Sequence, residues 1–441
     1  MSAVFYRNAS KSYPTAVSSE GVTITDENGK TYLDMSGGAA VSSVGHQHPA
    51  VVEAICKQVQ IMSFAHTSFF TNDPQERLAA LLASKFGEEG ARVYFTAGGS
   101  EANETAFKLA WQYFRALGQP NKRKIISRDH SYHGNTLGTL SASGNRARRR
   151  VMGDLLLEWP RIAPCYAYRH KAEDESLSDY AQRTANTLEE QILLEGADTV
   201  AAFIAEPIVG ASLGVVPAEE GYFKRIREIC DRYDVLLIAD EIMCGSGRTG
   251  SFYAHEQDRF LPDIVTLAKG IAGGYMPLAA TIARRHIHQT FTDKGRNFDH
   301  GHTYVGHAVT CAAGLAVLNV MDNENLLSRV QEMGVKLETA LKKAFGQHSH
   351  VGDIRGRGLF LGLEIVADRA SKVPFADELN ITKKLMVATM KHGLIVYPGG
   401  GSEIDQLGSH ILLAPPYIID DHHIADLIEK LDLILADVLP K

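Results

Sequence analysis

The chain has 441 residues, of which 22% are charged, with a formal net charge of −7 and a pI near 6.2. This acidic balance argues against nucleic-acid or membrane-surface partners and favours small-molecule ones. The five scattered cysteines, the absence of a CxxC pair and the lack of any apolar stretch of roughly 18 residues predict a soluble cytoplasmic protein without disulfides or zinc.

The predicted elements begin with a hairpin at 20–34, where alternating apolar positions flank the turn signal Glu27-Asn28-Gly29. A helix follows at 49–60. From about 92 to 285, short apolar strands alternate with helical patterns; the strands are RVYFTA, KIISR, VAAFIAEP, VLLIADE, DIVTLA and LAATIA. This alternation predicts an α/β fold in which helices flank a mostly parallel sheet.

A second, smaller lobe is predicted beyond residue 323, where apolar residues at three- and four-residue spacing indicate a long amphipathic helix. Later strands are expected at 358–366, 393–397 and 410–414, and helices near 376–391 and from about 421. The loop 398–408 is glycine-rich, and we predict that it is mobile. We expect a large domain at 51–322 and a small α+β domain built from 1–50 and 323–441.

The turn Gly98-Gly99-Ser100 lies between a predicted strand and a predicted helix. Glycines allow the backbone to approach a ligand, and the free N–H groups of a helix start favour a phosphate. An ordinary helix start with Ser100 as the N-cap residue fits the pattern equally well. Glu206 likewise falls at the carboxyl end of a predicted strand, where ligands bind in such sheets.

Asp240 ends an otherwise apolar strand, where a charged carboxylate needs a partner. A protonated pyridine nitrogen would be such a partner, and the ring could then accept electrons from a substrate carbanion. Ile242 lies two residues on, so its side chain could pack on the ring face. A helix cap or a surface salt bridge is the commoner role for a single aspartate at a strand end.

Lys269 stands between a short β-branched strand and Gly270. An amine at the mouth of a buried strand is placed for imine chemistry, and burial near a cation would lower its pKa. Most lysines are simply solvated, which is the alternative. Tyr132 could stack on a planar cofactor, although a core aromatic is the commoner reading.

Two other polar groups receive no catalytic role. The histidines His300, His302 and His307 lack matching carboxylates or thiols, so we expect structural roles and no bound metal. The basic run 146–150 is short, and we predict a solvated surface there.

The combination resembles the class III (subgroup II) aminotransferases of fold type I, which include ω-amino acid and amine transaminases. The resemblance covers nearly the whole chain. It rests on GGAAVSSVGHQHPAVVEAI, FTAGGSEANETAFKLA, SYHGNTLG, IAEPIVG, IADEIMCGSGRTG, TLAKGIAGGYMPLAA, HGHTYVGHAVTCAAGLA and LLAPPYI, in the family's order.

The resemblance implies pyridoxal 5′-phosphate as cofactor, held by Lys269 as a Schiff base, with Asp240 against the pyridine nitrogen. It implies a homodimer with shared active sites, in which Thr303 reaches the phosphate of the neighbouring subunit, and it leaves open whether dimers pair into a tetramer. The remaining implied cofactor residues are Gly99 and Ser100 at the phosphate, Tyr132 and Ile242 on opposite ring faces, His133 and Glu206. The implied substrate-pocket residues are His66, Phe69 and Tyr132.

The chain departs from the family at two carboxylate-binding positions. Some relatives carry an arginine directly after the aromatic-His-Gly motif, where this chain has Asn135. Others place a mobile arginine before the Pro-Pro motif, and here no arginine occurs between residues 392 and 415. α-Ketoglutarate therefore loses support as amino acceptor. Small residues at 38–40 occupy a stretch that is bulky in many amine transaminases.

We therefore expect a pyridoxal-phosphate transaminase that moves an amino group from an amine or an ω-/β-amino acid to a small 2-oxo acid such as pyruvate. An aminomutase or a decarboxylating aminotransferase on the same fold is the first alternative. A non-catalytic α/β scaffold is the second, although loss of Lys269 or Asp240 would be its signature and both are present.

Overall fold

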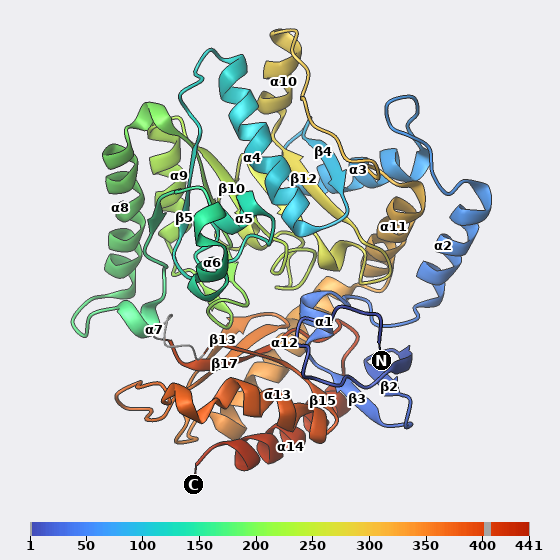
Figure 1. The fold of residues 1–441 in the computed structure, drawn as a ribbon, viewed down its shortest axis with the longest axis vertical. Coiled ribbons are helices and arrows are strands. Elements are labelled where there is room, and N and C mark those ends of the chain that lie inside the picture. Colours follow the sequence, from blue (N-terminus) through green and yellow to red (C-terminus); the bar gives the residue numbers. More distant parts are fainter. Residues whose placement is uncertain (1, 401–406, 441) are drawn as a thin grey trace.

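A seven-stranded sheet organises the larger body of the molecule (Figure 1). The structure is a computed structural model that describes residues 2–400 and 407–440. In spatial order the strands are β4 (Arg92–Thr96), β12 (Ala279–Ala283), β11 (Ile264–Leu267), β10 (Leu236–Asp240), β7 (Val200–Ala205), β5 (Lys124–Arg128) and β6 (Arg161–Ile162). Only β12 runs antiparallel to its neighbours, so the predicted mostly parallel sheet is confirmed.

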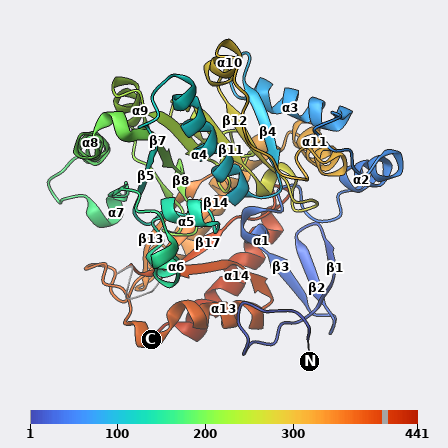
Figure 2. The same ribbon diagram turned by 45° about the horizontal axis from the view of Figure 1, so that its top comes forward.

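Helices cover both faces of this sheet (Figure 2). The helices are α2 (Pro49–Ile61), α3 (Asp73–Lys85), α4 (Gly99–Ala116), α5 (Leu137–Ala142), α6 (Arg146–Met152), α7 (Ala167–His170), α8 (Leu177–Glu195), α9 (Tyr222–Arg232), α10 (Arg285–Asp293) and α11 (Ala308–Asn323). On β7, Ala202 and Ile204 face the core that contains α4 and α10, whereas Phe203 faces the core that contains α8 and α9. Burial on both faces explains why this strand is a continuous apolar run.

The smaller part is built from both ends of the chain (Figure 1). One sheet joins β1 (Ala16–Glu20), β2 (Thr23–Asp26) and β3 (Thr31–Asp34) to β15 (Leu394–Ile395) through a parallel pairing of β3 with β15. A second contains β13 (Val351–Arg357), β14 (Phe360–Ile365), β17 (Ser409–Leu413) and β16 (Tyr397–Gly400). Its helices are α12 (Leu326–Phe345), α13 (Ile381–Lys391), α14 (Asp421–Val438) and the short α1 (Gly37–Ala40). A separate two-stranded sheet, β8 (Ile208–Val209) with β9 (Val216–Pro217), comes from the middle of the chain. The boundaries near residues 50 and 322 stay a prediction.

The structure shifts several predicted elements. The strand expected at 358–366 begins at Phe360, because Gly358 adopts a φ of 57° in the turn that joins it to the unpredicted β13. The helix expected at 376–391 begins at Ile381, because Asn380 is left-handed and separates it from a short 3₁₀ turn. Of the loop predicted to be mobile, 398–400 lie in β16, and 401–406 fall outside the described residues.

Within the part of the chain that the structure describes, no helix has the length and apolar character needed to cross a membrane.

Candidate active site

Strand register brings the predicted ionisable groups to one edge of the large sheet. Asp240, the last residue of β10, pairs with Thr266 of β11. Lys269 follows three residues later, in a 3₁₀ turn where its own φ is 51°. Glu206 directly follows β7, the neighbour of β10 on the other side. All three side chains therefore emerge at the carboxyl ends of adjacent strands, as predicted.

A cavity of about 230 Å³ opens at this edge. Its lining is Gly99, Ser100, Tyr132, His133, Gly134, Glu206, Asp240, Ile242, Met243, Ala268 and Lys269. Every residue predicted to contact the cofactor is in this lining except Thr303. Met243 was not predicted, and nothing in the sequence distinguishes its side chain from that of an ordinary core methionine.

Three donors hold the carboxylate of Asp240. Its Oδ2 accepts from Asn103 Nδ2 at 2.8 Å and from His133 Nδ1 at 2.8 Å, and its Oδ1 accepts from the Ile242 N–H at 3.1 Å. A carboxylate offers about four acceptor positions, so one remains for a donor inside the cavity. Asn103 is itself fixed by the Thr266 hydroxyl, which donates to its Oδ1 at 2.8 Å. Its position on α4 gave no sequence signal for this role.

Lys269 has the lowered pKa that its predicted chemistry requires. Burial lowers the pKa of its amine to about 8, and the nearby Arg248 guanidinium acts in the same direction, while Asp240 and Glu206 oppose it. The Nζ donates a hydrogen bond to the Ala39 carbonyl at 3.0 Å. Near neutral pH, a useful fraction of this amine is uncharged and nucleophilic.

Glu206 positions the loop that carries Tyr132. Its Oε1 accepts from the Tyr132 N–H at 3.0 Å, and its Oε2 accepts from the Gly210 N–H at 2.9 Å. Burial raises the pKa of Glu206, with a contribution from the charge of Asp240, while His133 lowers it. Both oxygens are thus engaged by backbone donors at the edge of the cavity.

The start of α4 has the features of an anion site. The first N–H groups of a helix have no intrahelical acceptor. Here the N-cap residue is Gly98, which has no side chain that could accept hydrogen bonds from them. The Ser100 Oγ accepts from the Asn135 N–H at 3.0 Å and is not the N-cap, so that alternative was wrong. A Cβ at Gly99 would lie 2.8 Å from Ile242 Cδ1, which shows how closely the backbone approaches the cavity wall.

Thr303, His66 and Phe69 do not line the cavity of the single chain. All three are exposed, and Phe69 is 80% exposed. The ring centroids of His66 and Phe69 lie 6.0 Å apart. Nearby, Phe64 contacts Tyr304, the residue after Thr303, at a centroid distance of 5.8 Å. Their predicted roles therefore stay predictions that require a second subunit.

The basic run 146–150 is largely solvated, as predicted, since Arg146, Arg148 and Arg150 are exposed and only Arg149 is half-buried. Arg149 donates to the carbonyls of Leu140 at 2.9 Å and Ser141 at 2.6 Å. The guanidinium of Arg148 lies over the Tyr132 ring, with its central carbon 4.6 Å from the ring centroid. One residue of the run therefore touches the cavity lining.

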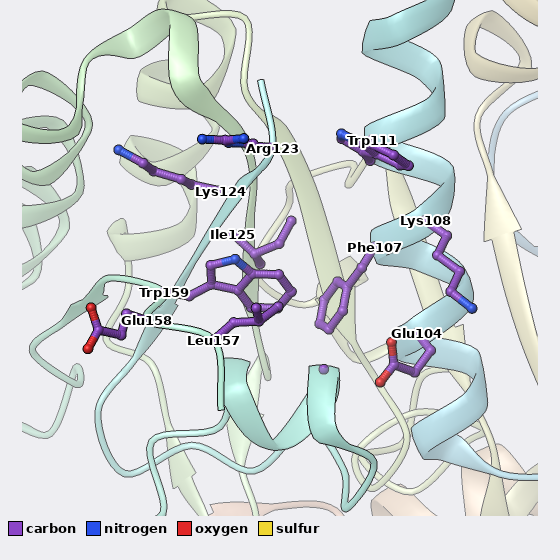
Figure 3. A pocket seen from close by; sticks show the side chains of 11 residues that line it. Glu104, Phe107, Lys108, Trp111, Arg123, Lys124, Ile125, Leu157, Glu158 and Trp159 are labelled. Atoms are coloured by element: carbon purple, nitrogen blue, oxygen red, sulfur yellow. The ribbon is translucent and has the colours of Figure 1, made fainter. Parts of the chain in front are cut away.

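A larger hollow of about 520 Å³ lies elsewhere, between α4, α5 and β5 (Figure 3). Its floor contains Phe107 and Trp159, whose rings meet edge to face at 5.4 Å. It shares no lining residue with the Lys269 cavity, which alone of the two brings Lys269 and Asp240 together. We therefore assign the chemistry to the smaller cavity.

Comparison with known proteins identifies the family. Residues 5–435 match the family described as aminotransferase class-III. The chain belongs to this family. An uncharacterised Schizosaccharomyces pombe aminotransferase is 40% identical over 437 residues, covering 99% of this chain and 95% of that protein.

Two further relatives of this class III aminotransferase have names that describe an activity. A chloroplastic γ-aminobutyrate transaminase from tomato (Solanum lycopersicum) is 37% identical to this chain. The match covers 95% of this chain and 80% of the tomato protein. The crystal structure of an (S)-enantioselective ω-transaminase from Thermomicrobium roseum has a TM-score of 0.91 and 38% identity, covering 97% of this chain and 93% of that one.

Class III aminotransferases use pyridoxal 5′-phosphate, and the residues of the cavity fit it. The one open acceptor position on Asp240 suits a protonated ring nitrogen. The uncapped start of α4 suits the phosphate. The Lys269 amine, with its lowered pKa, suits covalent attachment to a carbonyl.

Proposed function

We propose that this class III aminotransferase transfers an amino group from an amine or an ω-/β-amino acid to a small 2-oxo acid such as pyruvate. The observation that carries the proposal is that Lys269 and Asp240 face a single cavity. The similarity to an ω-transaminase and to a γ-aminobutyrate transaminase supports this donor class.

The residues of the cavity have separate roles in the proposed reaction. When bound, the cofactor supplies an electron sink for a substrate carbanion. Asp240 keeps the ring nitrogen protonated, which makes the sink effective. Lys269, with a pKa of about 8, takes a proton from the substrate carbon and returns it at another position. Tyr132 and Ile242, which both line the cavity, would contact the ring on its two faces.

The absence of arginine at two carboxylate-binding positions supports pyruvate over α-ketoglutarate as the amino acceptor. A dicarboxylate acceptor needs a cation for its second carboxylate. Asn135 stands at one position where relatives have an arginine, and residues 392–415 contain none. An acceptor with a single carboxylate makes no demand on either position.

A donor panel tests the proposed function. Amines, β-amino acids and ω-amino acids are each incubated with pyruvate or α-ketoglutarate, and both products are quantified. We expect alanine to accumulate with at least one ω-amino acid or amine, and faster than glutamate. Preferential formation of glutamate would refute the acceptor assignment. A product that retains its amino group on another carbon, or that has lost CO₂, would instead indicate an aminomutase or a decarboxylating enzyme.

A further inference from the structure

An exposed arginine, Arg148, contacts one of the residues that line the cofactor cavity. Arg148 projects from α6 onto Tyr132, and its Nη1 donates to the phenol oxygen at 3.3 Å. The central carbon of the guanidinium lies 4.6 Å from the centre of the same ring. Tyr132 in turn lines the cavity with Lys269 and Asp240. Arg148 itself is not in this lining, and it contacts the cavity wall through Tyr132.

In the part of the chain that the structure describes, the charge of Arg148 is not neutralised by an ion pair, unlike that of Arg146. Among the residues that the structure describes, no carboxylate lies within 4.0 Å of its guanidinium, whereas Arg146 lies 3.7 Å from Asp129. A guanidinium has five N–H donors, and within residues 2–400 and 407–440 the Tyr132 phenol is the one acceptor that Arg148 reaches. The Arg148 side chain is exposed, so its other donors are free to bind a ligand.

The surroundings of Arg148 suit an anionic group. Burial raises the pKa of the Tyr132 phenol, the positive charges of Arg148 and Arg7 act to lower it, and the charge of Asp240 acts to raise it. The carboxylates Asp240 and Glu206 line the cavity and are buried. The electrostatic pattern is therefore anionic at the reacting end and cationic at the rim. Stacking on a ring also fixes the orientation of a guanidinium, which reduces the entropy lost on binding a carboxylate.

We infer that Arg148 binds the distal carboxylate of an ω-amino acid donor while the donor's amine reacts beside Lys269. Arg148 stands at neither of the two carboxylate-binding positions considered above, Asn135 and 392–415. This inference rests on the proposed transaminase function and assigns one residue of its donor selectivity. A planar guanidinium also matches the bidentate geometry of a carboxylate, which a lysine does not.

A matched pair of donors tests the inference with the holoenzyme. 4-Aminobutyrate and butylamine have the same chain length and differ in the terminal carboxylate. The half-reaction of each is followed by the absorbance of the bound cofactor, for the wild type, R148Q and R148K. For 4-aminobutyrate, we expect R148Q to lower kcat/KM by about 10- to 100-fold, mainly through KM, because a hydrogen-bonded charge pair is lost. Butylamine should change less than about two-fold, and R148K should be intermediate.

R150Q is the control, since Arg150 is an exposed arginine on the same short helix. It should behave as the wild type with both donors. Binding of butyrate, which has the carboxylate but no amine, gives a readout that is independent of turnover. We expect calorimetry to show that R148Q weakens butyrate binding about ten-fold or more.

The outcomes separate this inference from the proposed function. An equal loss with both donors would show that Arg148 only holds Tyr132 in place, and an unchanged R148Q would show no role; either result overturns the inference. A wild type that converts butylamine but not 4-aminobutyrate would overturn it as well. A wild type that converts no donor in any class would refute the proposed function itself.

Discussion

At the scale of single residues, the chemistry depends on how far the protein lowers the pKa of the Lys269 amine. Burial lowers its pKa to about 8 from an ordinary value of 10.5, and Asp240 limits the drop by favouring the charged form. Only the uncharged amine attacks a carbonyl. The rate at which the apoenzyme captures pyridoxal 5′-phosphate should therefore rise with pH and level off above a midpoint near 8.

The D240N variant tests in which direction the charge of Asp240 shifts the pKa of Lys269. Removing the negative charge removes an interaction that raises the pKa of Lys269, so the midpoint should move below that of the wild type. Stopped-flow absorbance across pH 6 to 10 measures both midpoints. A wild-type midpoint near that of a free lysine would show that burial does not control this amine.

Residue identity was only partly predictable. Asp240 and Lys269 were recognised because a charged residue at the end of an apolar strand is unusual. Asn103 and Met243 were missed because periodicity does not tell which side chain of a helix or a turn faces a ligand. Arg148 was missed for a different reason, because a run of arginines is typical of solvated surface. Only the structure shows that Arg148 contacts the ring of Tyr132 whereas Arg149 binds backbone carbonyls.

At the scale of elements, we expect the packing of α4 against the segment after β10 to determine how well the start of α4 binds the cofactor phosphate. A methyl group at Gly99 would lie 2.8 Å from Ile242 Cδ1. G99A should therefore displace the helix start or Ile242 and weaken cofactor binding by about ten-fold, the lower part of the range for overpacking of a well-packed site. Equilibrium titration of the apoenzyme with pyridoxal 5′-phosphate measures this loss.

Two variants make this prediction specific. G98A is a matched control, because a Cβ at Gly98 meets no atom within 4 Å and its φ is −155°. It should bind the cofactor almost as the wild type does. I242A should partly restore affinity to G99A by removing the obstructing side chain. Equal losses in G98A and G99A would refute the steric explanation.

Strands were predicted well where burial on both faces gives a continuous apolar run, as in β7 and β10. β13 was missed because its sequence, VGDIRGR, alternates polar and glycine residues and its burial is intermittent. The pairing of β3 with β15 joins two segments more than 300 positions apart through a strand of two residues. No local pattern signals a contact of that kind.

At the scale of the whole molecule, we predict a homodimer with shared active sites. Thr303 and the aromatic side chains of Phe69, Phe70 and Tyr304 are exposed in the single chain, at 80%, 66% and 64% for the three aromatics. Exposed large apolar side chains in a group mark an interaction surface. Light scattering should give about twice the chain mass of 48.2 kDa or a multiple of that value.

T303A then tests whether the partner contributes to the site. The variant should remain a dimer yet bind pyridoxal 5′-phosphate about ten-fold more weakly, because one hydrogen bond to a charged group is lost. A monomer that retains full cofactor affinity would contradict both the dimer and the role of Thr303.

The central claim is that Lys269 and Asp240 bind the same cofactor molecule. Identifying the lysine that forms the covalent bond to the cofactor tests this claim most directly. The protein reconstituted with pyridoxal 5′-phosphate is reduced with borohydride, digested and examined by peptide mass spectrometry. We predict a phosphopyridoxyl group on Lys269 and on no other lysine, and a clear loss of cofactor affinity in D240A. Modification of a different lysine, or undiminished affinity in D240A, would contradict the account.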